Sequence, residues 1–167
     1  VTRYPDAPIR VFNAGVGGNT AAGALPRFRQ DIRDPKPAVV ALAFGMNDGR
    51  YRDFDADIFA AYQRHMTTLL NRVGDETDAR AILLTPPMYD RRKKADRPDY
   101  NRTLVRYGQW LAAVGKERGL EVIDLNAPMV AITAALRESD PAATLSRDGV
   151  HPAPTGHLVL AHTLLKA

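Results

Sequence analysis

The sequence predicts an α/β fold with a parallel sheet, because short apolar stretches alternate along the chain with longer amphipathic ones. The stretch at residues 38–44 is continuously apolar, as expected of a strand that is covered on both faces. The chain has 167 residues, of which 45% are hydrophobic and 25% charged, so residues 1–167 suit a single domain with one core.

The strands are expected where apolar stretches are closed by turn-forming residues. They cover residues 9–13, 38–44, 81–85 and 121–124. Gly15 follows the first of these strands, and the pair Pro86-Pro87 stops the third.

The helices are expected between and after the strands. They cover residues 20–34, 55–73, 100–118, 128–137 and 154–165. In the second, apolar side chains recur at helical spacing from Phe59 to Val73, and Asp55 or Asp57 can cap its start. Gly119 follows the third helix at the position where glycine commonly ends one.

Composition excludes several classes of function. The formal net charge is +4, but outside a basic cluster at residues 91–97 the charge is dispersed, and no nucleic-acid-binding motif is present. No apolar run is long enough to predict a membrane-spanning helix. The absence of cysteine excludes thiolate catalysis and cysteine-ligated zinc.

Three loops carry residues that can do chemistry. Residues 13–20 (Asn-Ala-Gly-Val-Gly-Gly-Asn-Thr) and 45–49 (Gly-Met-Asn-Asp-Gly) each follow a predicted strand, where open parallel sheets bind ligands. Residues 148–152 (Asp-Gly-Val-His-Pro) precede the last helix. Histidine shuttles protons near neutral pH, and an aspartate three residues earlier can orient its imidazole. Taken alone, this pattern is better explained as a loop whose aspartate caps the following helix and whose histidine has no special role.

The two glycine-containing loops also have more than one interpretation. The side chain of Asn47 can donate a hydrogen bond to a developing oxyanion, although taken alone the loop Gly-Met-Asn-Asp-Gly is better explained as a plain turn. The loop at residues 13–20 lets backbone N–H groups approach a ligand, or is a plain tight turn. Dinucleotide binding is disfavoured, because Thr20 stands where a third small residue is required and Gly45 where an acid is expected.

The combination is more specific than its parts. Residues 13–20, 45–48 and 148–151 resemble, in order and spacing, three of the conserved blocks of the SGNH/GDSL hydrolases, a family of serine esterases and lipases. This resemblance covers essentially the whole chain. It implies the flavodoxin-like three-layer sandwich of the SGNH hydrolase fold, with a parallel sheet of strand order 2-1-3-4-5.

The resemblance also implies roles for individual residues. Gly18 would give a backbone N–H, and Asn47 a side-chain N–H, to the oxyanion hole. His151 would be the general base and then the general acid, oriented by Asp148, while Asp48 would hold the turn that aims Asn47. No metal or organic cofactor is implied. The expected substrate is a small-molecule or carbohydrate ester with a short acyl group such as acetyl.

The Gly-Asp-Ser block that supplies the nucleophile in this family has no match here. The only serines are Ser139 and Ser146, and neither follows an apolar strand or sits in a glycine-rich turn. We therefore expect a single SGNH hydrolase domain that lacks its first, central strand, belongs to a larger parent chain, and is inactive alone. Without that strand, two strand edges would face a gap.

Three further hypotheses stay open at this point. In the first, the chain is a non-catalytic relic of the fold that binds a carbohydrate or acyl ligand. In the second, Asp148, His151 and His157 hold a zinc ion. The basic loop at residues 88–99 either borders the site and favours anionic or sugar-rich substrates, or is a solvated loop.

Overall fold

The computed structural model describes residues 6–93 and 98–167. Its centre is a parallel sheet of three strands in the order β1-β2-β3: β1 (Val39–Ala43), β2 (Arg80–Leu84) and β3 (Glu121–Ile123). Val39 pairs with Arg80, and Ile82 with Glu121. Open parallel strands with helices between them confirm the predicted α/β fold.

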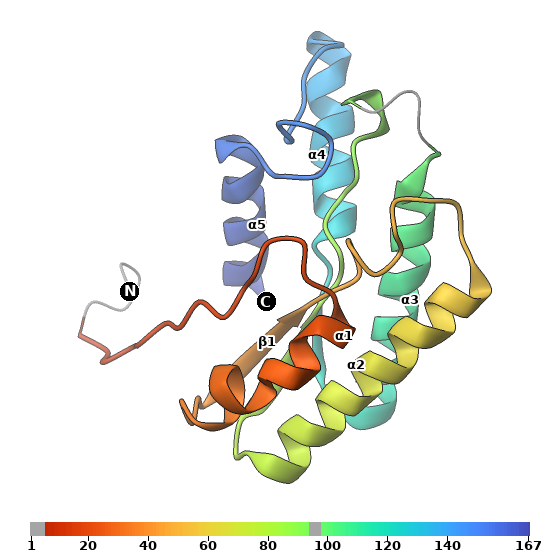
Figure 1. Ribbon diagram of the computed structural model, residues 1–167. Helices are drawn as coiled ribbons and strands as arrows, with labels where there is room; N and C mark the ends of the chain where they lie inside the picture. Colours follow the sequence, from red (N-terminus) through yellow and green to blue (C-terminus); the bar gives the residue numbers. More distant parts are fainter. Residues whose placement is uncertain (1–5, 94–97) are drawn as a thin grey trace.

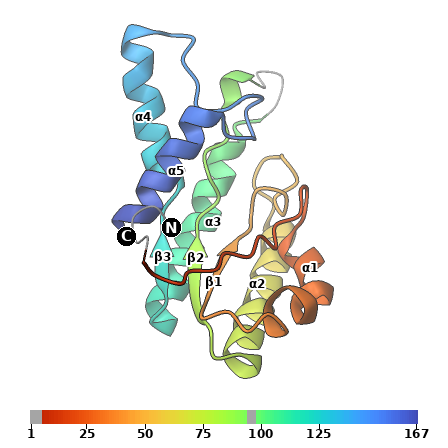
Figure 2. The same cartoon turned by 90° about the vertical axis from the view of Figure 1, so that its left-hand side faces the viewer.

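The helices form one layer on each face of the sheet (Figure 2). On one face lie α1 (Ala21–Ala24), α2 (Ala56–Glu76) and α3 (Tyr100–Arg118), with the main core between them and the sheet. On the other lie α4 (Asn126–Ser139) and α5 (Pro154–Lys166), which pack on each other, and Leu160 of α5 packs on residues of β2 and β3. The sheet is therefore the middle of three layers.

The helices start and stop near the expected positions for identifiable reasons. Asp55 caps α2, because its side chain accepts hydrogen bonds from the N–H groups of Asp57 and Ile58, both at 3.0 Å. Of the apolar residues predicted to share one face of α2, those from Tyr62 to Val73 are buried and Phe59 is partly buried. Gly119 ends α3 with a φ of 65°. The fourth predicted helix begins earlier than expected, at Asn126.

The helix predicted at residues 20–34 is helical but not one α-helix. Thr20 caps α1 by accepting a hydrogen bond from Gly23 N. A 3-10 turn, η1 (Leu25–Arg27), and a π-helical turn, η2 (Arg29–Arg33), then follow. Pro26 lies inside η1, and its missing N–H removes one α-helical hydrogen bond, so the helix changes type there.

The prediction of a strand at residues 9–13 was wrong. This segment has no strand assignment, and Figure 1 draws it in red without an arrow. Extended chain becomes a strand only when a neighbour supplies ladder hydrogen bonds. No other described strand lies beside it, and the side chains of Ile9, Val11 and Phe12 are 49%, 80% and 61% exposed.

The expectation that the strand at residues 38–44 is covered on both faces was also wrong. Its exposure alternates: Val40 and Leu42 are buried against α2 and α3, whereas Val39 is 49% exposed. The layer of α4 and α5 packs on residues of β2 and β3. One face and one edge of β1 therefore have no cover among the described residues.

None of the helices in the described part of the chain is both long and apolar enough to cross a membrane.

Candidate functional site

Asp148 and His151 form a hydrogen-bonded pair at the surface. The imidazole Nδ1 lies 2.9 Å from Asp148 Oδ2, while Asp148 Oδ1 accepts hydrogen bonds from the backbone N–H groups of His151 (2.9 Å) and Val150 (3.0 Å). These donors, the His151 N–H foremost and then the imidazole, hold the pKa of Asp148 well below its usual value. The pair can therefore keep Asp148 ionised and direct Nε2 away from it, as a general base requires.

The segment that carries this pair, residues 144–153, is called the strap below, and Ser146 braces it. The Ser146 Oγ accepts a hydrogen bond from Gly149 N at 2.7 Å and donates one to His151 O at 3.2 Å. Ser146 is buried, and Arg147 N donates to His151 O at 2.9 Å. Because its hydroxyl is bonded to backbone, Ser146 is a structural residue of the turn.

Asp90 fastens the strap to the rest of the molecule, and sequence reasoning did not single it out. Its carboxylate Oδ2 accepts hydrogen bonds from Arg137 of α4 and from Thr144 Oγ1, both at 2.7 Å. Its N–H donates to Gly149 O at 2.9 Å. Burial acts to raise the pKa of Asp90, but the bonds from Arg137 and Thr144 outweigh it and lower this pKa. The aspartate thus stays charged although it is buried.

The loop at residues 45–51, called the Asn47 loop, is fixed by a second buried aspartate. Asp48 accepts hydrogen bonds from Ala21 N at Oδ1 and from Gly45 N at Oδ2, both at 2.9 Å. Burial raises the pKa of Asp48, and the two backbone donors oppose this rise. Asp48 therefore joins the loop after β1 to the first turn of α1.

Asn47 joins this loop to the glycine-rich loop at residues 13–20. Its Nδ2 donates to Asn19 O at 2.9 Å, and its Oδ1 accepts a hydrogen bond from Tyr51 Oη at 2.6 Å. Asn19 follows Gly18, whose φ of 73° lies in the left-handed region that favours glycine. A side-chain amide and the backbone of a glycine turn, the two kinds of donor expected for an oxyanion hole, are thus brought to adjacent positions.

The strap and the Asn47 loop meet at a cluster of aromatic side chains beyond the carboxyl ends of β1 and β2. Tyr89, Tyr100 and Leu104 form its buried part, and Met46, Tyr51 and Val150 pack against it. Val150 belongs to the strap and Met46 to the Asn47 loop. The structure therefore brings together the three loops that the sequence singled out, and Tyr51 is a residue of this region that no sequence motif indicated.

The zinc-site hypothesis and the basic-loop hypothesis gain no support from the geometry. Among the described residues, no three His, Cys, Asp or Glu side chains are grouped closely enough to hold a metal ion. The basic loop lies in part outside the described residues, at positions 94–97. Its described part, η3 (Arg91–Lys93), is fastened by a bond from Arg92 to Pro141 O at 2.7 Å.

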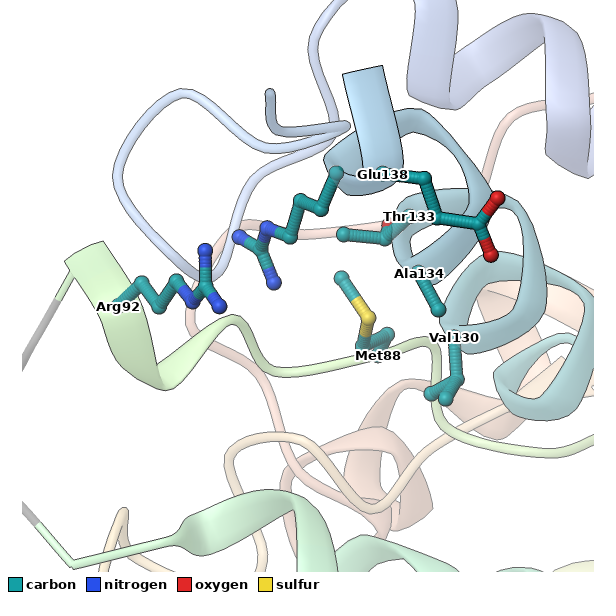
Figure 3. Close-up of a pocket in the computed structure, with 7 residues that line it drawn as sticks. Met88, Arg92, Val130, Thr133, Ala134 and Glu138 are labelled. Carbon is teal, nitrogen blue, oxygen red and sulfur yellow. The ribbon is translucent and has the colours of Figure 1, made fainter. Parts of the chain in front are cut away.

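An open cavity of about 390 Å³ lies between this loop and α4. In Figure 3, Arg92 extends from η3 toward α4, which contributes Val130, Thr133 and Ala134, and Met88 lies between Arg92 and these side chains. That this loop borders the site and selects the substrate stays a prediction.

Comparison with known proteins identifies the family. Residues 2–159 match the GDSL-like Lipase/Acylhydrolase family. The chain belongs to this family. It is 30% identical over 168 residues to an acetylxylan esterase of Geobacillus stearothermophilus, an alignment that covers 98% of this chain and 74% of the esterase.

Solved structures agree with this membership of the GDSL-like family. The structure of the Geobacillus acetylxylan esterase superposes with a TM-score of 0.74 at 26% identity, covering 98% of this chain and 74% of the esterase. BT4096, a gut microbial diltiazem-metabolizing enzyme, superposes with a TM-score of 0.87 at 32% identity. That match covers 99% of this chain but only 40% of BT4096. The SGNH hydrolase fold expected from the motifs is thereby confirmed.

Proposed function

We propose that this chain carries the base and the oxyanion donors of a serine esterase that removes short acyl groups, above all acetyl, from carbohydrate esters. The observation that carries the proposal is the Asp148–His151 pair, 2.9 Å apart and joined through the tyrosines to the loop of Asn47. The similarity to an acetylxylan esterase supports the choice of substrate class. Serine-to-alanine and aspartate-to-alanine variants of that esterase are described as catalytic mutants.

In the proposed reaction, a serine hydroxyl attacks the acyl carbonyl while His151 Nε2 takes its proton. The oxygen that becomes negative is held by Gly18 N–H and one Nδ2–H of Asn47, each such donor contributing about 10²–10³ in rate. Protonated His151 then gives the proton to the leaving alcohol oxygen, which completes an acyl-enzyme. Water then attacks the acyl carbonyl while the same imidazole takes its proton, and His151 returns that proton to the serine Oγ as the Oγ–acyl bond breaks, which releases the carboxylic acid.

The nucleophile is proposed to lie upstream of the sequence given. The Oγ of Ser146 is bonded to backbone, and that of Ser139 donates to Leu136 O in α4, so neither is offered to His151. The free edge of β1 and the exposed apolar side chains of residues 9–13 support a further strand between them.

The test uses this chain and a version extended upstream on its native gene. Each is treated with a fluorophosphonate probe, its intact mass is measured, and acetate release from acetylated xylo-oligosaccharides is followed. We expect one adduct on an upstream serine of the extended protein and none on the short chain. His151→Ala should nearly abolish acetate release by the extended protein, whereas His157→Ala, which changes an exposed histidine of α5, should leave it unchanged.

Other results would reassign the function. An adduct on Ser146 would show that the strap opens to expose a nucleophile. Labelling of neither protein, together with saturable binding of the oligosaccharide, would favour a ligand-binding relic of the fold. Acetate release that survives His151→Ala would remove His151 from the mechanism.

A further inference from the structure

Tyr51 holds the acceptor end of the Asn47 carboxamide. Its hydroxyl donates to Asn47 Oδ1 at 2.6 Å, while the opposite end of the same amide donates from Nδ2 to Asn19 O at 2.9 Å. Both bonds require the same orientation of the amide, because a flipped amide would turn Nδ2 toward Tyr51 and Oδ1 toward the carbonyl of Asn19. One of the two Nδ2–H groups remains for another acceptor.

Tyr51 is itself held in an unusual backbone conformation. Arg50 and Tyr51 have φ values of 58° and 54°, in the left-handed region that residues other than glycine seldom adopt. Such strain persists where the surroundings over-determine it, and it is concentrated at functional sites. Here the Tyr51 ring packs on those of Tyr100 and Tyr89, with centroids 5.2 and 6.4 Å away. The strained turn points the hydroxyl back at Asn47.

The turn under Tyr51 is anchored independently of Asn47. Tyr100 Oη donates to Met46 O at 2.7 Å, and Gly49 has no room for a Cβ because the Tyr100 ring and hydroxyl fill that space. The position of Tyr51 relative to the backbone of the Asn47 loop is therefore set by the core, so Tyr51 can impose an orientation on Asn47.

We propose that Tyr51 is a positioning residue for the oxyanion donor Asn47, fixing the donor end of its carboxamide toward the loop of Gly18. This inference rests on the proposed function. By donating to Oδ1, the phenol also polarises the amide and makes its N–H groups stronger donors. Val150 of the strap packs against the same aromatic cluster as Tyr51.

The phenol keeps its proton under ordinary conditions. Burial, and secondarily the negative charge of Asp148 and the neighbouring Tyr89, raise the pKa of Tyr51 above its usual value. Tyr51 therefore remains a donor to Asn47 through neutral and mildly alkaline pH, where a histidine base is active.

The first measurement is made on the chain as it stands. Tyr51→Phe keeps the ring and removes only the hydroxyl. We expect the side-chain NH₂ resonances of Asn47, assigned by their loss in Asn47→Asp, to shift and to exchange with solvent about tenfold faster. Tyr62→Phe is the matched control: Tyr62 is buried, its hydroxyl reaches Phe44 O only at 3.5 Å, and its loss should leave Asn47 unchanged. Unaltered Asn47 resonances in Tyr51→Phe would overturn the inference.

The second measurement uses the upstream-extended protein and separates this inference from the proposed function. Tyr51→Phe should lower kcat for acetyl ester hydrolysis about tenfold with KM unchanged, and Asn47→Ala about 10²–10³-fold. If Asn47→Ala lowers kcat but Tyr51→Phe does not, Tyr51 has no positioning role. If the extended protein hydrolyses no ester, the proposed function fails, while the Asn47 resonances still decide whether Tyr51 orients the amide.

Discussion

The candidate site is bordered by backbone segments that are held in two opposite ways. The strap and the Asn47 loop are irregular, yet each is fastened by a buried carboxylate, Asp90 or Asp48, that bonds residues distant in sequence. The N-terminal segment, residues 6–18, contains no helix or strand, and its hydrogen bonds are mostly local, such as Gly15 N to Asn13 Oδ1 at 2.9 Å. The two loops are therefore held more firmly than the N-terminal segment, because long-range hydrogen bonds to buried carboxylates fix them.

The two kinds of segment differ because their backbone N–H groups find hydrogen-bond acceptors in different places. A loop beyond a sheet has no ladder, so its N–H groups need side-chain acceptors, and a carboxylate supplies several at once. Residues 9–13 have the apolar composition of a strand, but no strand in the described part of the chain pairs with them. One hydrogen bond, from the Arg27 guanidinium to Ala14 O at 2.9 Å, joins the N-terminal segment to η1. The contrast predicts a graded series of mutational effects.

The largest effect is expected at Asp90. Asp90→Ala leaves the mostly buried Arg137 guanidinium without its carboxylate and frees the strap at Thr144, which should lower the free energy of unfolding by about 3–5 kcal/mol. Urea unfolding measures this value. Asp53→Ala, at an exposed aspartate, is the control and should stay within about 0.5 kcal/mol. A loss below about 1 kcal/mol for Asp90→Ala would mean that the strap is held by other contacts.

A smaller loss is expected at Asp48. Asp48→Asn keeps one acceptor but turns an NH₂ group toward one of two backbone donors, Ala21 N or Gly45 N, which should cost about 1–3 kcal/mol. Faster hydrogen exchange of those two amides would locate the effect. The matched change is Asp55→Asn at the start of α2, where asparagine caps as well as aspartate and stability should hardly change. Equal losses at both sites would show that burial of Asp48 is immaterial.

The pair in the strap predicts a pH dependence. Because the pKa of Asp148 is lowered in the folded protein, the unfolded chain binds its proton first, so this contribution is present near neutral pH and is lost as the pH falls below about 4. The pair is largely exposed, so its contribution after screening is at most about 1 kcal/mol. Asp148→Asn should therefore be less stable than the parent at pH 7 and closer to it at pH 3. A stability gap that is constant with pH would contradict the assignment.

The same contrast explains what the sequence could predict. Periodicity and capping residues located α2, α3 and the three strands of the sheet, because those signals are local. The prediction of a strand at residues 9–13 was wrong because a strand needs a neighbouring strand, which the local sequence pattern does not specify. The motifs located His151 and Asn47, but not the residues that hold them. Asp90 meets Arg137 and Thr144 across 47 and 54 positions, and no local pattern marks such contacts.

The smallest effect is expected in the N-terminal segment. Val11 is 80% exposed, so Val11→Asp should change the free energy of unfolding by no more than about 0.5 kcal/mol. Leu42→Ala in β1, where the side chain is 3% exposed, should cost about 2–5 kcal/mol and serves as the buried counterpart. Urea unfolding at several protein concentrations measures the free energy of unfolding of both variants. A loss above about 1.5 kcal/mol for Val11→Asp that grows with protein concentration would show that this segment pairs with a second copy of the chain in solution. The contrast between the fastened loops and the N-terminal segment would then hold only for the isolated chain.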